Sequence, residues 1–163
     1  MILKTIQHIK AVGALRAGET YYALPSEAPN RIEPYRIMQK HYKYEHTPVF
    51  ACVQGKYSNF YGAMTSPEHI LLTLNAPDDQ VKLQSYYNWS DIIYFMEFPN
   101  EWNNKDIPFS NFIKDTLDGT NIRSCSAIQA TLPYIRPEWL MTVKPLTEKF
   151  LQNYYGNGGN RIL

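Results

Sequence analysis

The sequence contains few cysteines: Cys52 and Cys125 are the only two among 163 residues. Two thiols cannot build the disulfide framework that stabilises small secreted domains, so their number favours a reducing compartment while leaving a single disulfide open. Neither belongs to a Cys-x-x-Cys pair, and both lie in apolar segments. We interpret both as inert core thiols rather than nucleophiles.

A charge excess of either sign is also missing, because Lys and Arg number 16 and Asp and Glu number 15. The net charge of +1 gives no overall field that would hold nucleic acid or an anionic membrane, although a local basic patch stays open. No apolar run approaches the length of a membrane span, and residues 1–8 lack the apolar core and cleavage site of a signal peptide. We predict a soluble, cytoplasmic protein.

Several common chemistries have no motif in the chain. There is no Gly-x-x-x-x-Gly-Lys loop for phosphates and no Gly-x-Gly-x-x-Gly turn for dinucleotides. The four histidines (His8, His41, His46 and His69) lack the paired spacing of metal ligands. We therefore expect no zinc site.

Aromatic residues are abundant, with 13 tyrosines and 14% aromatic residues in total. Tyrosine serves both as half-buried core and as a flat, polar-tipped surface in interfaces and nucleotide pockets, and the core role is the simpler interpretation. The length and the 44% hydrophobic content suit one domain with a substantial core. We predict this domain over residues 1–155, followed by a flexible Gly-rich tail at 156–163.

Apolar periodicity and turn residues predict about six strands and four or five helices. The strands are expected at 3–7, 49–53, 70–74, 80–84, 125–132 and 140–143, and the helices at 8–17, from 34 to before 47, at 88–96, at 110–118 and at 147–155. These elements are grouped rather than strictly alternating. The pattern favours an α+β fold with a mixed or antiparallel sheet over a doubly wound parallel sheet.

Basic and aromatic residues gather around the second predicted helix. They are Arg31, Arg36, Lys40, His41 and Lys43, interleaved with Tyr35, Tyr42 and Tyr44. Guanidinium groups contact phosphates in pairs of hydrogen bonds, and aromatic rings offer stacking planes to bases. The alternative is a solvated helix face whose aliphatic stems cover the core. Arg36 is the residue that we single out first for testing.

Three glutamates are candidate acids. Glu138 follows Pro137 in a helical first turn, where a carboxylate simply favours the helix N-terminus. Glu97 and Glu101 lie beside Trp102, and either side chain could approach a pocket. Spacing alone does not decide between a pocket and the surface.

The order of these segments resembles the DarT-type branch of the ADP-ribosyltransferase superfamily. The strand and helix from Thr5 through His8 to Gly18 are similar to that family's first strand and its helix ending in glycine. Residues 30–38 are similar to a segment in which an arginine enters a helix. Residues 129–143, which begin Gln-Ala-Thr-Leu-Pro, resemble the strand that carries the family's catalytic glutamate and its proline-led turn into another strand.

This resemblance implies a function and a site. The family transfers ADP-ribose from NAD to a nucleic acid or a protein, and here it implies a phage-encoded enzyme of bacterial–phage conflict. Catalytic positions then fall at Arg36 and Gln129, and NAD-binding positions at Gln7, His8, Arg31 and Tyr35. No membrane contact is implied, and the oligomeric state stays open.

The chain departs from the family pattern at two positions. The family's glutamate falls at Gln129, and its ribose-contacting histidine falls at Thr5, with His8 nearby but shifted. A neutral amide can bond a ribose hydroxyl but cannot act as a base or supply a full charge. Three interpretations therefore stay open: an enzyme in which Glu97, Glu101 or the acceptor supplies the acid, a non-catalytic module that binds a nucleotide, nucleic acid or protein as an anti-defence or antitoxin-type inhibitor, and an unrelated α+β interaction domain.

Overall fold

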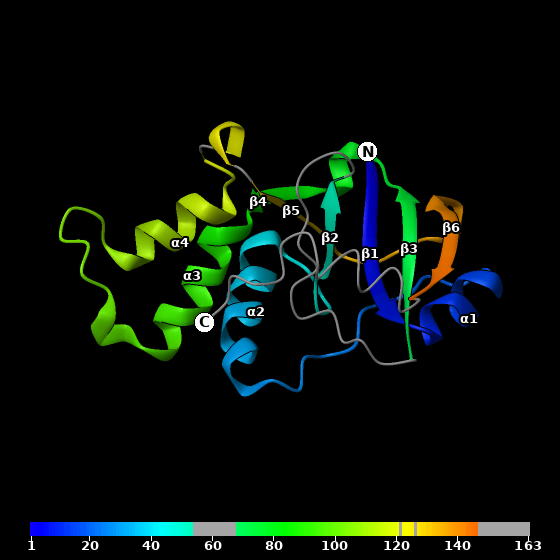
Figure 1. The fold of residues 1–163 in the computed structure, drawn as a ribbon, viewed down its shortest axis with the longest axis horizontal. Coiled ribbons are helices and arrows are strands. Elements are labelled where there is room, and N and C mark those ends of the chain that lie inside the picture. Colours follow the sequence, from blue (N-terminus) through cyan, green and yellow to red (C-terminus); the bar gives the residue numbers. More distant parts are fainter. Residues whose placement is uncertain (54–67, 121, 126, 147–163) are drawn as a thin grey trace.

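The computed structural model describes residues 1–53, 68–120, 122–125 and 127–146. Its centre is an antiparallel sheet of six strands in the order β4-β5-β2-β1-β3-β6 (Figure 1). The strands are β1 (Ile2–His8), β2 (Val49–Val53), β3 (His69–Asn75), β4 (Lys82–Ser85), β5 (Ile128–Leu132) and β6 (Leu140–Pro145). The predicted α+β class with an antiparallel sheet is confirmed.

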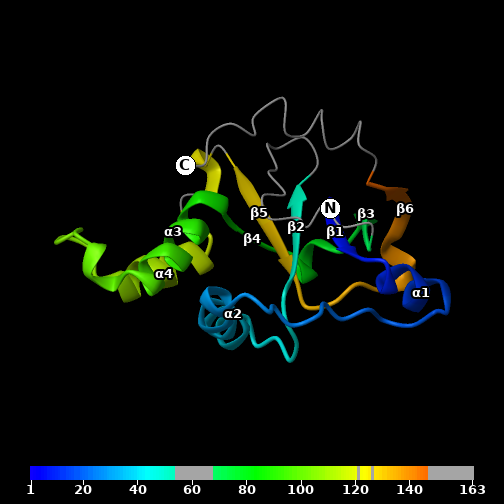
Figure 2. The same cartoon turned by 60° about the horizontal axis from the view of Figure 1, so that its bottom comes forward.

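Helices flank the two ends of this sheet. They are α1 (Lys10–Arg16), α2 (Pro29–Tyr42), α3 (Tyr86–Glu97) and α4 (Phe109–Leu117), with short 3₁₀ turns between elements. Helix α1 lies beside β3 and β6, and α2, α3 and α4 gather at the β4–β5 end (Figures 1 and 2). The predicted helix at 147–155 and the predicted tail at 156–163 fall outside the described residues.

Two hydrophobic clusters hold these layers together. In the larger one, Leu3, Leu72 and Leu132 of the sheet are fully buried with Val12 and Leu15 of α1. In the smaller one, side chains of α2, α3 and α4 (Met38, Trp89, Ile92 and Leu117) pack together, with Phe50 of β2 against them. The smaller cluster fixes α2 and α3 to the sheet, and this arrangement positions the candidate site.

Some element boundaries differ from the predictions. Helix α2 begins at Pro29, so Pro34 lies inside the helix rather than in its first turn, and its ring is buried. The helix ends at Tyr42 because Lys43 adopts a left-handed backbone (φ 58°), before Thr47 is reached. Strand β5 begins at Ile128 because residues 122–124 form a 3₁₀ turn.

The turn after α4 requires glycine. Gly119 has φ +70°, and a Cβ built on it would lie 2.9 Å from the Leu83 carbonyl oxygen of β4. Gly119→Ala is therefore expected to lower the free energy of unfolding by about 2 kcal/mol or more, from backbone strain and overlap together. Gly18→Ala is the control, because Gly18 has φ +80° with open space around it and loses about 1 kcal/mol from strain alone. Urea unfolding of both variants measures the difference, and equal losses would contradict the overlap.

Candidate functional site

The sheet opens where β1 meets β2. Strand β1 pairs with β3 along its whole length, from Ile2↔Asn75 to His8↔His69. Among the described residues it pairs with β2 at just two positions, Leu3↔Val53 and Lys4↔Cys52. Beyond them, the Thr5 hydroxyl donates to the Phe50 carbonyl oxygen at 2.6 Å, so a side chain takes over from the backbone ladder. The second half of β1 is thereby free to line a cavity.

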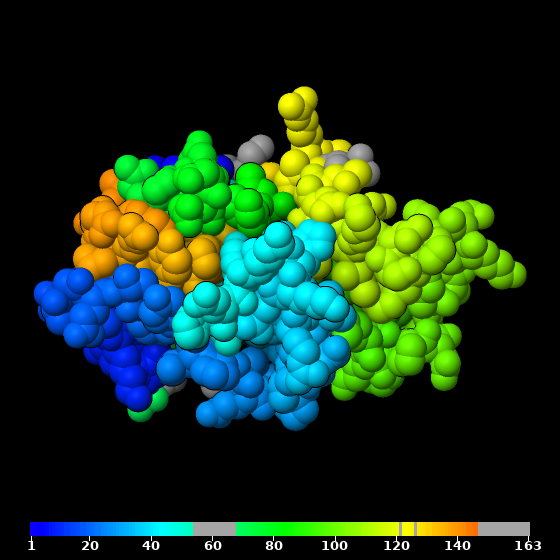
Figure 3. All heavy atoms as spheres, turned by 180° about the vertical axis from the view of Figure 1, so that it is seen from behind, coloured from blue at the N-terminus to red at the C-terminus, as the bar shows by residue number. Residues whose placement is uncertain are grey.

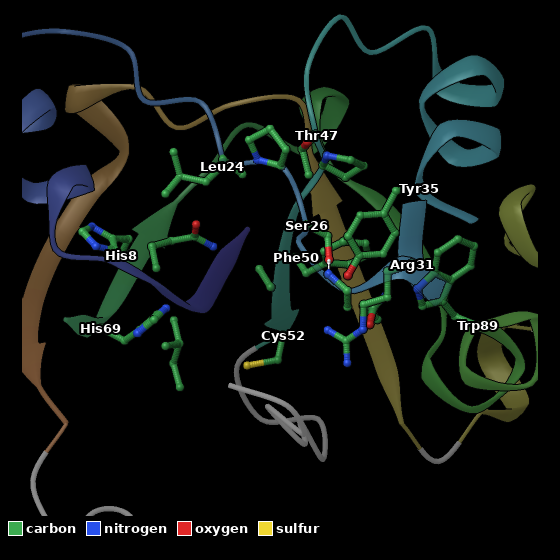
Figure 4. A pocket seen from close by; sticks show the side chains of 18 of the residues that line it. His8, Leu24, Ser26, Arg31, Tyr35, Thr47, Phe50, Cys52, His69 and Trp89 are labelled. Carbon is green, nitrogen blue, oxygen red and sulfur yellow. Dashed lines mark hydrogen bonds between the residues drawn. The ribbon is translucent and has the colours of Figure 1, made fainter. Parts of the chain in front are cut away.

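A cavity of about 780 Å³ lies at this opening, within the range of small-molecule sites. Its walls come from several separate segments of the chain (Figure 4). They include residues 6–8 of β1, 50–52 of β2, residues 23–28 with Arg31 and Tyr35 of α2, Trp89, Ser90 and Ile93 of α3, Glu68 and His69, and Ile128 and Gln129 of β5. Segments distant in sequence thus contribute to one concave surface.

Five of the six residues selected from the sequence line this cavity: Gln7, His8, Arg31, Tyr35 and Gln129. The sixth, Arg36, is not brought to it. Its side chain is 70% exposed, and Nη1 lies 2.9 Å from Oε2 of Glu33. The cause is helical geometry, because Arg31 and Tyr35 are four residues apart on one face of α2 and Arg36 is rotated away from it.

One end of the cavity is cationic and aromatic. The ring of Tyr35 lies 4.9 Å from that of Phe50 and 6.4 Å from that of Trp89, nearly parallel to the indole. The Arg31 guanidinium lies beside these rings (Figure 4). Burial raises the pKa of the Tyr35 hydroxyl, and the neighbouring Arg31 partly offsets the rise. A positively charged guanidinium group beside flat aromatic rings can hold a phosphate next to a stacked base.

Imidazole groups occupy the opposite end. His8 and His69 are cross-strand partners on β1 and β3, and their ring centroids lie 5.9 Å apart (Figure 4). Nδ1 of His8 accepts a hydrogen bond from the Lys10 backbone amide at 3.1 Å, and its Nε2 lies 3.7 Å from Oε2 of Glu68. Burial, and then the charge of His8, lower the pKa of His69. The neutral form of His69 is therefore favoured in the folded protein.

Gln129 sits in a row of polar side chains across three strands. On β5 it is the registered partner of Cys52 on β2 and of Gln84 on β4. The amide nitrogens of Gln129 and Gln84 are buried and have no hydrogen-bond partner among the described residues. Because Gln129 also lines the cavity, a rotation of its side chain that exposed this nitrogen would offer a ligand an unused donor.

The other acids considered from the sequence lie elsewhere. Glu97 is exposed and accepts a hydrogen bond from the Asn30 side chain at 3.1 Å, and Glu101 is exposed and bonded by the Tyr94 hydroxyl. Neither is among the residues that line the cavity. Glu138 occupies the first turn of a 3₁₀ helix and lies 3.7 Å from Arg136. Thr5 is fully buried and is not among the residues that line the cavity.

The wall residues that sequence reasoning missed include Glu27, Glu68, His69 and Trp89. The pairing of His69 with His8 depends on strand register, which no local pattern reveals. Trp89 belongs to a predicted helix start, but nothing local indicates that it faces a cavity. The two glutamates belong to connecting segments without any periodic pattern.

Metal and membrane sites are not found in the part of the chain that the structure describes. No group of three or more His, Cys, Asp or Glu side chains there could hold a metal ion. The helices within those residues are too short or too polar to cross a bilayer.

Comparison of the chain with family models, curated proteins and solved structures finds no match. The ADP-ribosyltransferase resemblance therefore stays a prediction.

The lowered pKa of His69 predicts a pH dependence of stability. The unfolded state binds the proton near pH 6.5, and the folded state binds it only at lower pH, so folding excludes a proton in between. The free energy of unfolding is expected to fall from about pH 7 to about pH 5, and less steeply in His69→Gln. Asp118 does not interfere, because its bond with Lys114 lowers its pKa below 3.8. Equal slopes in urea titrations of both proteins would contradict the assignment.

Proposed function

We propose that this protein binds NAD or a related nucleotide in the cavity between β1, β2, α2 and α3, as an ADP-ribosyltransferase-like domain. One observation carries the proposal. Five residues chosen from the sequence for NAD, on three elements distant in the chain, line a single cavity of suitable size.

The chemistry of the walls matches a nucleotide in three respects. Arg31 provides paired donors for a phosphate. The rings of Tyr35 and Phe50, backed by the buried ring of Trp89, provide flat apolar surface for a base. The unused amide donor of Gln129 provides a hydrogen bond for a ribose hydroxyl. Each group thus has a counterpart in one ligand class.

Gln129 also favours binding without efficient turnover. As nicotinamide leaves NAD, positive charge develops on the ribose, and a nearby carboxylate would stabilise that charge. A neutral amide supplies no full charge and cannot remove a proton from an acceptor. We therefore propose a non-catalytic nucleotide-binding protein, of the anti-defence or antitoxin type, as the principal function.

Two carboxylates at the wall support a second candidate, transfer of ADP-ribose to a nucleic acid or protein in bacterial–phage conflict. Glu27 and Glu68 both line the cavity. Either could replace the charge that Gln129 lacks once a ligand is bound, although Glu68 already lies 3.7 Å from His8. The two candidates share the binding step and differ in turnover.

Calorimetric titration with NAD, ADP-ribose and AMP tests the binding step, and quenching of Trp89 fluorescence reports on the same cavity. Release of nicotinamide from NAD, measured alongside, separates the two candidates. Binding without release supports the principal function, and release that is lost in Glu27→Gln or Glu68→Gln supports transfer. If none of the three nucleotides binds at millimolar concentration, the proposal fails.

A further inference from the structure

Helices α3 and α4 form an acidic arm at the β4 end of the sheet. The arm, residues 86–118, projects away from the strands (Figure 1). It carries six carboxylates and two lysines: Asp91, Glu97, Glu101, Asp106, Asp115 and Asp118, with Lys105 and Lys114. Fourteen of the sixteen cationic residues of the chain and nine of its fifteen carboxylates therefore lie outside the arm. A protein of net charge +1 is thus strongly polarised.

Apolar side chains remain exposed on the arm. Its interior is closed by ring contacts among Phe95, Trp102, Phe109 and Phe112. Outside this group, Tyr94 and Phe98 are each 44% exposed with ring centroids 5.1 Å apart, and Ile107 is also exposed. Exposed aromatic and aliphatic side chains grouped in this way are typical of interaction surfaces.

A basic corner lies next to the arm. Lys40 and Lys43 are exposed at the end of α2, and Lys82 is exposed on β4. They belong to one corner, because Thr131 is the registered partner of Lys82 and its carbonyl oxygen accepts the hydroxyl of Tyr44, the neighbour of Lys43. The nearby Asp118 is already paired with His41 and Lys114, at 2.9 and 2.6 Å. Among residues 43–47, Glu45 is the carboxylate.

The corner and the arm share one face of the molecule. In Figure 3, the end of α2 and the segment after it, in cyan, lie beside the arm in yellow-green. In a dimer whose two-fold axis passes between the arm and the corner, the arm of one copy faces the corner of the other. The same acidic-to-basic contact therefore forms twice. The exposed rings of the arm would add apolar contact to such a dimer.

We propose that two copies of this chain pair through this face, with the arm of each copy against the Lys40–Lys43–Lys82 corner of the other. The charges are complementary, and the occupant is a surface that the chain itself provides. The proposal concerns a surface other than the cavity and does not depend on nucleotide binding.

Sedimentation velocity of the full chain, at several concentrations and two salt levels, tests the pairing. We expect a dimer at micromolar concentration whose dissociation constant rises at least tenfold between 50 mM and 500 mM NaCl, because screening weakens the charge contacts. Phe98→Ser is expected to weaken the dimer at least tenfold without unfolding the chain, since that ring is exposed. A wild-type protein that stays monomeric up to about 100 µM overturns the proposal.

Charge reversal makes the test specific. The arm variant Glu101→Lys with Asp106→Lys and the corner variant Lys40→Glu with Lys43→Glu are each expected to be monomeric, and their equimolar mixture is expected to regain the dimer mass. Glu19→Lys with Asp79→Lys changes the charge as much outside both surfaces, and should remain dimeric. Circular dichroism checks that each variant is folded. Dimers in both single-surface variants, or a mixture that stays monomeric, would overturn the assignment.

Discussion

Arg31→Ala is expected to weaken NAD binding by about 10- to 100-fold, whereas Arg36→Ala leaves it within about twofold. Arg31 lines the cavity beside Tyr35, and a charged hydrogen bond to phosphate is worth about 1.5–3 kcal/mol, which converts to this range. Arg36 lies on the same helix but pairs with Glu33 at the surface. Calorimetric titration of both variants measures the difference.

The two arginines form a matched pair, because each substitution removes the same atoms from α2. Loss of the exposed Arg36–Glu33 pair costs the helix a few tenths of a kcal/mol at most, so both variants should fold normally. Equal weakening by both would mean that α2 acts through its general charge rather than through the cavity. Unchanged affinity in Arg31→Ala would remove the phosphate contact from the proposal.

Gln129→Glu is expected to raise the rate of nicotinamide release from NAD by about a hundredfold or more over the wild-type protein. The substitution places a carboxylate at the cavity wall, where it can stabilise the cationic ribose that forms as nicotinamide leaves. One well-placed electrostatic group is commonly worth about 3–4 kcal/mol in the transition state. Single-turnover release of labelled nicotinamide gives the rate.

The fold offers a partner for that carboxylate. The registered neighbour on β4, Gln84, is fully buried and holds an amide nitrogen without a hydrogen-bond partner among the described residues. This nitrogen can donate to a carboxylate at position 129, which offsets part of the cost of burying the charge. The variant is therefore expected to fold and to bind NAD.

Two further variants serve as controls for the Gln129→Glu prediction. Gln129→Ala removes the amide without adding charge and should not accelerate release. Adding Arg31→Ala to Gln129→Glu should abolish the gain, because NAD would no longer be held. If Gln129→Glu binds NAD as the wild-type protein does but releases no more nicotinamide, then position 129 does not face the reacting ribose.

Sequence patterns correctly predict an element when its boundaries depend on residues adjacent in sequence. Strand β2 is predicted at 49–53, as observed, because a short apolar run follows Pro48. The predicted start of α2 is wrong because Pro34 resembles a first-turn proline, whereas Pro29 occupies that position and the buried ring of Pro34 is accommodated inside the helix. Burial overrides the local preference there, and the sequence alone does not show it.

The residues of the candidate site also fall into those placed by local helix spacing and those placed by strand register. Once α2 is a helix from Pro29, the spacing of Arg31 and Tyr35 places them on one face and turns Arg36 away. The facing of His8 and His69 depends on the β1–β3 register, and the placing of Gln129 beside Gln84 depends on the β4–β5 register. Such pairings join residues about 60 and 45 positions apart, beyond the reach of any local pattern.

Composition and periodicity were enough to establish the α+β class and the gathering of basic and aromatic residues around α2, because these signals act over a few residues. The choice of position 129 came from the family resemblance. The separation of β1 from β2, and the enclosure of the resulting space by α2, α3 and β5, became apparent in the folded chain alone. The reason is physical: side-chain packing and strand register, rather than local propensity, fix which distant surfaces meet.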